Sequence, residues 1–568
     1  MKIKSSYWLF GILLLAAILR FWHLTVPDLI TDDSLNSFRA VGWFDYLSSP
    51  SQTTPIQWFG HIPFWANFSF HDGPPLVFAI QKFFFFIFGD NTLAARLPFT
   101  LFGLATVYLV YLLATELRNR TVGLLAAFLI SILSFHVWIS HIGYLEGIEI
   151  FFITLTLWLL IKFINTKQRK FLYFLGISLG LTILTKYTAL FLLPAILVYW
   201  LIFDRGIYKT KEFWLAGLLF ILILSPVIFY NCMVFTTRGH FDAALSSMLG
   251  LKFDDFKSVA SRAATGNPLN NFFALGQSLF SLVSWPLLVS GLASMLLLGG
   301  RRLLKINQGQ KNDILILLAA VFCLIFLTFG NLSGERFLSI FTPFLAIIVA
   351  LVSFDVINFF QHKNWLYGKI ASVTLLVVVL SWELFYSINS HLLLRPMSTS
   401  ALVYSSAVPK LSDSLGLNQL DQYLRQEVLP VNLTFQRPKN LDVISETVSK
   451  NLAETKTFYF FDEAIQWFAY NWYFGRYQIY YGLPMGSLYG AVKSAEGNDV
   501  IGMMHAMGVE TFYFIYPVTD VLLDPVKAGG DQRKISIEFA ASLEAQGIKP
   551  VEIKNYFDEV AFKVYKFN

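Results

Sequence analysis

The sequence predicts a polytopic α-helical membrane protein with a smaller α/β domain at its C-terminal end. Of its 568 residues, 55% are hydrophobic and only 14% are charged, and its mean hydropathy is +0.57. Apolar runs of bilayer-spanning length recur through the first 388 residues, after which the hydropathy falls. A soluble monomer is excluded, because so few charged residues could not cover so much apolar surface. The same composition also excludes a disordered chain and a coiled coil.

Eleven apolar segments are candidate spans. They lie near residues 7–22, 97–116, 121–137, 144–162, 171–184, 188–203, 213–231, 275–298, 313–330, 337–356 and 370–387. The first has no small-residue cleavage site and ends at Arg20, so we expect a retained span and no cleaved signal peptide. The run 75–89 is apolar but short and contains Gln81 and Lys82, which predicts a juxtamembrane helix in the interface.

The positions of Lys and Arg predict the orientation of these spans. With the N-terminus in the cytoplasm, the inner connections carry seventeen Lys and Arg in tight clusters, and the longer outer loops carry nine. Counting 75–89 as a further span would reverse every later loop and destroy this asymmetry. We therefore expect a multi-pass protein of the plasma or inner membrane, with its C-terminal domain extracytoplasmic.

The chain divides into a membrane domain, residues 1–388, and an extracytoplasmic α/β domain, residues 389–568. The first outer loop of the membrane domain covers 23–96 and carries candidate catalytic residues. In the second domain the periodicity predicts helices over Leu417–Val428, Leu441–Ala453 and Ile535–Glu544, and strands over Thr457–Phe461, Thr511–Tyr516 and Val560–Phe567. Gly508 and Gly547 each stand where a helix is expected to give way to a strand.

Ionisable residues concentrate in the outer loops and are scarce at the centres of the spans. Ion-coupled transporters usually place such groups at the midplane of the membrane. Acids and cations at one face of an apolar scaffold instead predict an interfacial site that receives a lipid-linked substrate from the bilayer and a second substrate from outside.

Asp32 and Asp33 follow the first span and precede a short amphipathic stretch. Adjacent acids at this place are typical of a helix N-cap. A carboxylate beside the membrane face is also suited to take a proton from an attacking hydroxyl. The two roles are compatible, and we take Asp32 and Asp33 as the catalytic candidates.

Three further residues are candidates for orienting an acceptor or holding a metal ion. Asp72 precedes two prolines, which would stiffen the entry to a helix; Glu146 begins a span, where the helix dipole favours an acid; and His240 lies in a long outer loop. Their spacing matches no metal motif, and the two cysteines, Cys232 and Cys323, form no CxxC motif. The sequence therefore requires no cofactor and leaves a divalent cation open.

Three cations are candidates for binding a phosphate group. Lys186 lies in a tight outer turn, where it is either an interface anchor or a phosphate ligand. Arg336 either pairs with Glu335 or presents its guanidinium fork to a phosphate. We group Arg39, in the first outer loop, with them. Phosphate-binding glycine loops and nucleic-acid signatures are absent, so no nucleic-acid partner is expected.

The order of these features resembles the polytopic GT-C glycosyltransferases that use lipid-phosphate sugars, in particular the protein O-mannosyltransferases and the lipid A aminoarabinose transferases. The shared motifs stand here as Ile18-Leu19-Arg20-Phe21, Asp32-Asp33, Asp72-Gly73-Pro74-Pro75-Leu76, Ala95-Arg96-Leu97-Pro98, Leu184-Thr185-Lys186, and Arg336 followed by Pro343. Two positions depart from the family pattern. The acidic pair is usually Asp-Glu, and His or Lys often stands where this chain has Gly73.

The resemblance implies a GT-C fold and inverting transfer of a sugar from a polyprenyl monophosphate, undecaprenyl or dolichyl, to an acceptor on the outer face. The acceptor is a lipid, a glycan or a protein, and membrane lipids surround the site. Asp32 would be the base, while Lys186 and Arg336 would stabilise the departing phosphate. A lipid-linked glycan transporter or flippase without covalent chemistry is the alternative, and a non-catalytic envelope scaffold is a third reading.

Overall fold

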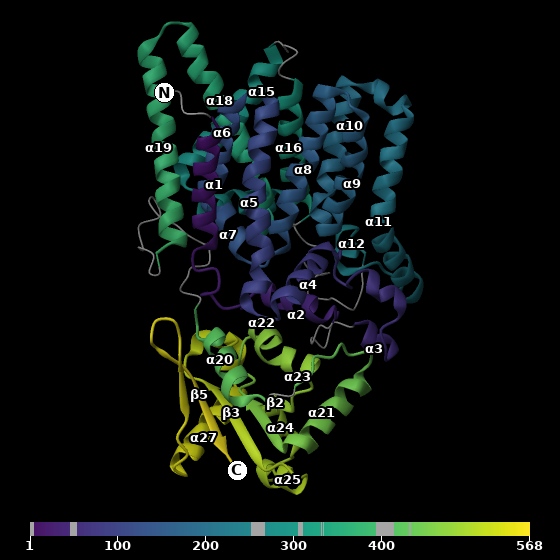
Figure 1. Cartoon of the computed structure of the whole chain (residues 1–568), viewed down its shortest axis with the longest axis vertical. Helices are drawn as coiled ribbons and strands as arrows, with labels where there is room; N and C mark the ends of the chain where they lie inside the picture. The colour runs from purple at the N-terminus through teal and green to yellow at the C-terminus, as the bar shows by residue number, and fades with distance from the viewer. Residues whose placement is uncertain are drawn as a thin grey trace.

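The computed structural model describes residues 5–45, 54–251, 267–304, 311–330, 332, 334–393, 414–430 and 433–568. A bundle of long helices forms one end of the molecule and an α/β domain forms the other (Figure 1). Short helices of the first outer loop lie between them. The predicted fold class is confirmed, and the chain is a multi-pass membrane protein.

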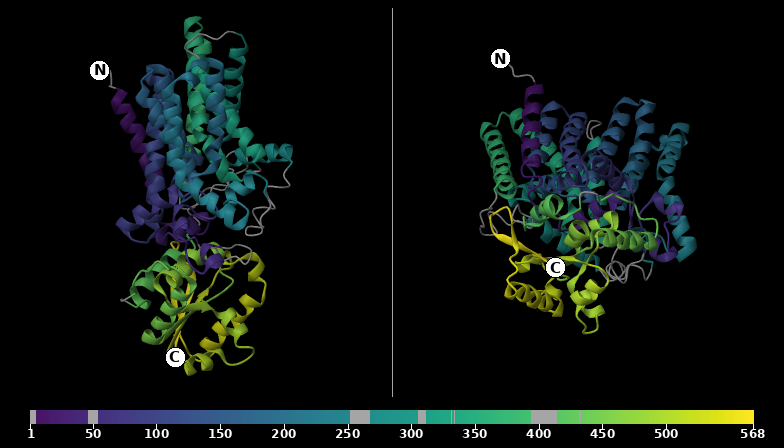
Figure 2. Two further views of the ribbon diagram at one scale, coloured as in Figure 1. Left: turned by 90° about the vertical axis from the view of Figure 1, so that its right-hand side faces the viewer. Right: turned by 60° about the horizontal axis from the view of Figure 1, so that its bottom comes forward.

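The bundle contains long apolar helices that run along one common direction (Figures 1 and 2). They are α1 (Ser5–Phe21), α5 (Thr92–Leu117), α6 (Arg120–Ile132), α8 (Leu145–Thr166), α9 (Arg169–Thr185), α10 (Leu192–Phe203), α11 (Lys211–Arg238), α15 (Trp285–Leu304), α16 (Lys311–Phe329), α18 (Thr342–His362) and α19 (Leu366–His391). In the described part of the chain, six helices are long and apolar enough to cross a membrane, or seven if α6 and α7 (Ser134–His141) form one bent span. The count of eleven spans stays a prediction.

Two of the expected spans are broken. The segment 275–298 falls on two helices, α14 (Pro268–Leu282) and α15, because Pro286 lacks the N–H that would continue α14 and its ring would clash with the preceding turn. The segment 121–137 bends by 61° between α6 and α7.

Buried side chains satisfy the backbone groups that these breaks expose. Arg20 on α1 donates to the carbonyls of Ile130 and Ser131 at the end of α6, both at 3.0 Å. Glu383 on α19 accepts from the N–H of Ser134 at 2.9 Å, where α7 begins, and from that of Ser284 at 3.2 Å, just before α15. One carboxylate therefore caps two helix N-termini, where unpaired N–H groups and the helix dipole both favour a negative charge.

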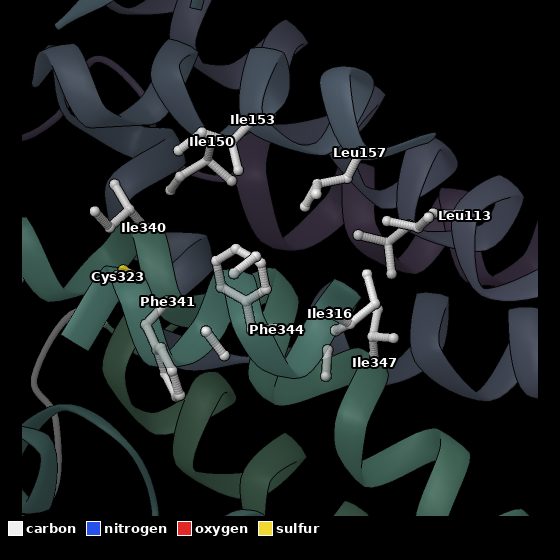
Figure 3. Packing of buried hydrophobic residues seen from close by; sticks show 14 of the residues in the cluster. Leu113, Ile150, Ile153, Leu157, Ile316, Cys323, Ile340, Phe341, Phe344 and Ile347 are labelled. Carbon is white, nitrogen blue, oxygen red and sulfur yellow. The ribbon is translucent and has the colours of Figure 1, made fainter. Parts of the chain in front are cut away.

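The core of the bundle forms where α5, α8, α16 and α18 meet. Leu113, Leu157, Ile316, Phe344 and Ile347 are almost completely buried and interdigitate there (Figure 3). Since α18 lies at the centre of the bundle, its first half is buried all around, which explains a sequence that is apolar on every face.

The α/β domain holds a five-stranded sheet of order β2-β1-β3-β5-β4. The strands are β1 (Thr457–Phe461), β2 (Met485–Ser487), β3 (Thr511–Pro517), β4 (Val551–Lys554) and β5 (Val560–Phe567). β1 is parallel to β2 and β3, and β5 is antiparallel to β3 and β4. The three expected strands are present as β1, β3 and β5.

The helices of this domain include the three that the sequence predicts. They are α20 (Leu417–Tyr423) with η7 (Leu424–Val428), α21 (Leu441–Thr455), α22 (Trp467–Tyr470), η8 (Asn471–Gly475), α23 (Arg476–Tyr481), α24 (Leu488–Ser494), α25 (Val500–Ala506), α26 (Pro525–Ala528) and α27 (Asp531–Ala545). Gly508 and Gly547 take positive φ angles of 92° and 83° after α25 and α27, as helix ends require. The proposed domain boundary at 388/389 stays a prediction: α19 continues to His391, and residues 394–413 lie outside the described residues.

The α/β domain docks on the first outer loop through buried polar contacts. The Asp28 carboxylate accepts from the N–H groups of Leu415, Leu417 and Asn418 at 2.6, 3.2 and 2.8 Å. The Tyr480 hydroxyl donates to the carbonyl of Phe38 on α2 (Asp32–Gly42) at 2.6 Å. A Cβ atom at Gly42 would lie 2.0 Å from the Tyr480 ring, so only glycine permits this close approach.

We expect Asp28→Ala to loosen this docking, because three buried N–H groups lose their acceptor at a cost of about 1–3 kcal/mol. Thermal unfolding and protease release of residues 414–568 measure the effect. Glu538→Ala is the control, since Glu538 lies on α27 and pairs with Lys534 at a largely exposed position. Wild-type protease resistance in Asp28→Ala would contradict the assignment.

Candidate functional site

A cavity of about 390 Å³ opens where the helical bundle meets the α/β domain. Its charged lining residues are Asp32, Arg39, Asp72, Glu146, Lys186 and Arg336. Six of the eight predicted site residues therefore line one cavity, although they come from five separate stretches of chain. Trp467 and Phe468 of α22 line it from the α/β domain.

The first turn of α2 separates the two adjacent acids. The Asp33 carboxylate is buried, accepts from the N–H of Thr31 and Ser34 at 3.2 and 2.9 Å, and pairs with Arg96 at 2.9 Å. The Asp32 side chain faces the cavity and is 35% exposed. Of the two catalytic candidates, Asp32 lines the cavity, whereas Asp33 does not and instead fixes the start of the helix that presents Asp32. The catalytic roles stay predictions.

Arg96, on α5, holds the whole entry to α2. Besides Asp33, its guanidinium donates to the carbonyls of Leu24, Pro27 and Asp28 at 3.2, 2.7 and 2.9 Å. This buried fork fixes the connection between α1 and α2, which carries Asp32 on one side and the docking residue Asp28 on the other. The Ala95-Arg96-Leu97-Pro98 motif thus has a structural role.

Acids and cations alternate along the polar wall of the cavity. Arg336 donates to Asp32, and Lys186 donates to Glu146. The Arg336 Nε lies 3.8 Å from the same Glu146 carboxylate, so these four residues form one network. The Phe337 ring lies beside both cations, 4.3 Å from the Lys186 Nζ and 5.0 Å from the Arg336 guanidinium carbon. These contacts hold two cations side by side at the cavity surface.

Arg39 and Asp72 form a third charge pair. The Arg39 Nη1 donates to the Asp72 Oδ2 at 2.6 Å, and the guanidinium is almost completely buried. Its Nε and Nη2 have no hydrogen-bond partner within the described residues. These two nitrogens are themselves buried, and the predicted phosphate-binding role of Arg39 stays a prediction.

Asp72, Glu146 and His240, the candidates for orienting an acceptor or holding a metal ion, do not form one cluster within the described residues. Asp72 and Glu146 pair with cations, and His240 does not line the cavity. The His240 ring centroid lies 5.6 Å from that of His71, and its Nδ1 is 2.6 Å from the Phe241 carbonyl. Among the residues that the structure describes, no cluster of three or more His, Cys, Asp or Glu side chains could hold a metal ion.

A buried network supports the far wall of the cavity. Asp242 caps α12 (Ala243–Met248), accepting from the Leu245 N–H at 2.8 Å, from the Tyr187 hydroxyl at 2.5 Å and from the Asn231 amide at 2.8 Å. Burial raises the pKa of Asp242 to about 6, although these hydrogen bonds oppose the rise. α12 then contributes Ala243, Ala244, Ser247 and Met248 to the lining.

Sequence reasoning missed the roles of Asp242, Trp467 and Phe468. Asp242 at the start of a short helix could have been found as an N-cap. The two aromatic residues follow β1, and ligand sites in parallel sheets favour the carboxyl ends of strands. Nothing in the sequence indicates that this edge meets the membrane domain.

Comparisons with known proteins agree with this architecture. A family model described as "Dolichyl-phosphate-mannose-protein mannosyltransferase" matches residues 72–230. A protein of Bacillus subtilis (strain 168) named "Putative mannosyltransferase YkcB" is 28% identical over 217 residues, 37% of this chain and 29% of the relative. An "Uncharacterized protein" of Aquifex aeolicus (strain VF5) is 36% identical over 158 residues, 27% of this chain and 31% of the relative. The matches span less than a third of the length of either relative.

Two solved structures share the fold. ArnT from Cupriavidus metallidurans bound to undecaprenyl phosphate has a TM-score of 0.53 and 11% identity, covering 99% of this chain and 98% of its own. The Archaeoglobus fulgidus oligosaccharyltransferase in the apo form has a TM-score of 0.52 and 14% identity, covering 91% of this chain and 70% of its own. The chain shares its fold with these two proteins, and the match over residues 72–230 confirms the resemblance to the protein mannosyltransferase family that the sequence indicated.

The raised pKa of Asp242 makes stability depend on pH. Between about pH 4 and 6 the folded protein binds a proton that the unfolded chain releases, so wild-type stability falls as the pH rises through this window. We expect a loss of about 3 kcal/mol relative to Asp242→Asn, with no further change above about pH 7. Melting temperatures of both proteins across this range test it, and parallel curves would contradict it.

Proposed function

We propose that the protein is a glycosyltransferase that moves a sugar from a polyprenyl monophosphate to an acceptor hydroxyl. The observation that carries the proposal is a carboxylate, Asp32, that shares one interfacial cavity with two adjacent cations, Lys186 and Arg336. In such a cavity the carboxylate would act as the base, and the two cations beside it would bind the phosphate. The family match over residues 72–230 supports the same activity.

The transfer inverts the anomeric carbon in one displacement. The acceptor oxygen forms a bond to C1 of the sugar while the bond from C1 to the phosphate oxygen breaks. Asp32 takes the acceptor proton as general base, and the polyprenyl phosphate leaves with the electron pair of the broken bond. Lys186 and Arg336 stabilise the negative charge that grows on the departing phosphate.

The ion pairs of the cavity must exchange partners when the donor binds. The cavity wall carries as many acids as cations, so its charges balance without a ligand. The acids are Asp32, Asp72 and Glu146, and the cations are Arg39, Lys186 and Arg336. A donor phosphate competes with Asp32 for Arg336 and with Glu146 for Lys186, since phosphate oxygens accept from cations as carboxylates do. Binding of the donor therefore releases Asp32 from its cation and leaves it free to accept a proton.

The site lies on the extracytoplasmic side in this proposal. The N-terminus is cytoplasmic, and the α/β domain lies outside with the cavity, as the distribution of Lys and Arg predicts. The polyprenyl chain lies in the bilayer beside the outer ends of the helices. A lipid, a glycan or a protein supplies the acceptor hydroxyl from the other side.

Incubation of the purified full-length protein with a panel of polyprenyl-phosphate sugars tests the activity. Release of free polyprenyl phosphate identifies the donor even before the acceptor is known. Movement of labelled lipid-linked sugar across liposomes without any bond cleavage would favour the transporter alternative. Absence of both cleavage and movement with every donor would favour a scaffold.

We expect Asp32→Asn to lower sugar transfer by about 10²–10⁴-fold, the range that a general base contributes. Donor binding and melting temperature should stay near the wild-type values, because Asp32 is partly exposed. Asp33→Asn is the informative comparison: it should lower the melting temperature, since Arg96 loses its buried carboxylate. Full transfer by Asp32→Asn would remove Asp32 as the base.

Lys186 needs a variant that preserves the charge balance of the wall. Lys186→Met alone would leave the buried Glu146 carboxylate with only its 3.8 Å contact to Arg336, so Lys186→Met/Glu146→Gln is the test. We expect this double variant to fold and to lose about 10²–10³-fold in rate, as when one stabilising group for a transition-state charge is removed. Glu146→Gln is the control because it keeps Lys186, and equal rates in the two variants would contradict the assignment.

A further inference from the structure

The α/β domain supplies one wall of the cavity. Trp467 and Phe468 begin α22 directly after the segment that follows β1, and both line the cavity opposite a wall made by the membrane domain. Their ring centroids are 5.1 Å apart with the planes at 65°. The charged residues of the cavity all belong to the membrane domain. We call the part of the lining made by Trp467 and Phe468 the aromatic edge, and it is chemically distinct from the charged part that is proposed to bind the phosphate.

Several contacts fix the edge in place. The Ser34 hydroxyl, on the first turn of α2, donates to the carbonyl of Phe468. The Leu29 N–H donates to the Tyr473 hydroxyl at 3.0 Å. Tyr473 lies in η8, a π-helical turn that continues α22, and such turns are frequent at functional sites. The aromatic edge is therefore held by the same turn that carries Asp32.

The contact between Ser34 and Phe468 indicates which of the two substrates the aromatic edge touches. The base must lie beside the acceptor hydroxyl, and the cations must lie beside the donor phosphate. Ser34 is two residues from Asp32 and bonds to Phe468, so the aromatic edge borders the base.

We propose that Trp467 and Phe468 form the acceptor subsite, and that the acceptor group placed there is a sugar ring; this rests on the proposed transferase activity. An aromatic face carries partial negative charge and offers a large apolar surface. The C–H face of a pyranose is apolar and slightly positive, so the two surfaces pack together. The hydroxyls at the edge of the ring then point toward Asp32.

A glycan acceptor fits the cavity better than a peptide does. Extended peptides are commonly bound by adding a strand to a free sheet edge. The described lining residues lie on helices and connections, and none belongs to the strands β1–β5. A volume of about 390 Å³ suits compact groups of small-molecule size.

The test compares Trp467→Ala, Trp467→Phe and wild type in the full-length protein. The donor is the one that the panel identifies, and the acceptor probes are methyl α-mannopyranoside, methyl α-glucopyranoside and a threonine-containing peptide. We expect Trp467→Ala to raise KM for the glycoside at least about tenfold. Trp467→Phe should restore most of the affinity, because its ring keeps an apolar aromatic face.

Tyr556→Ala is the matched control, because Tyr556 is an aromatic residue of the same domain that lies outside the cavity and is 43% exposed. An unchanged glycoside KM in Trp467→Ala, or transfer to the peptide alone, would overturn the proposal. If the wild type cleaves no donor, the transferase proposal fails instead. Saturation-transfer NMR with the methyl glycosides then still decides the subsite: loss of the signal in Trp467→Ala supports it, and no signal with wild type overturns it.

Discussion

The guanidinium of Arg96 is the constraint on which both the site and the domain arrangement depend. It donates to three backbone carbonyls in the connection between α1 and α2 and to the Asp33 carboxylate, and it is almost completely buried. A buried arginine is stable only when nearly all of its donors find acceptors, so this loop has little freedom. Asp28 and Asp32 lie on the loop so fixed, one facing the α/β domain and the other facing the cavity.

Arg20 and Glu383, which are buried in the helical bundle, also fix the arrangement of the backbone. They complete the hydrogen bonds of backbone groups where α6 ends and where α7 and α15 begin. In an apolar medium each unpaired backbone group would be costly, which explains why a carboxylate and a guanidinium are retained there. Their role is structural, and it agrees with a site confined to one end of the bundle.

The cavity combines a balanced wall of charge with an aromatic wall from a second domain. A network of three acids and three cations needs no counter-ion while empty, yet each pair is able to open toward a charged ligand. The aromatic wall offers apolar contact and little charge. In the proposed reaction, the phosphate leaves beside the charged wall and the neutral hydroxyl group arrives beside the aromatic wall.

The sequence by itself determined the elements and the polar candidates. Spans, the juxtamembrane helix α4 (Leu76–Phe88), and strands β1, β3 and β5 follow from hydropathy and periodicity, which are local properties of the chain. The positions of the spans also predicted that Asp32, Lys186 and Arg336 lie at the same end of the helices, and all three line one cavity. Only the tertiary structure separated Asp32 from Asp33, excluded His240 from the cavity and brought Trp467 into it. These distinctions depend on contacts between residues tens to hundreds of positions apart, and no local pattern encodes such contacts.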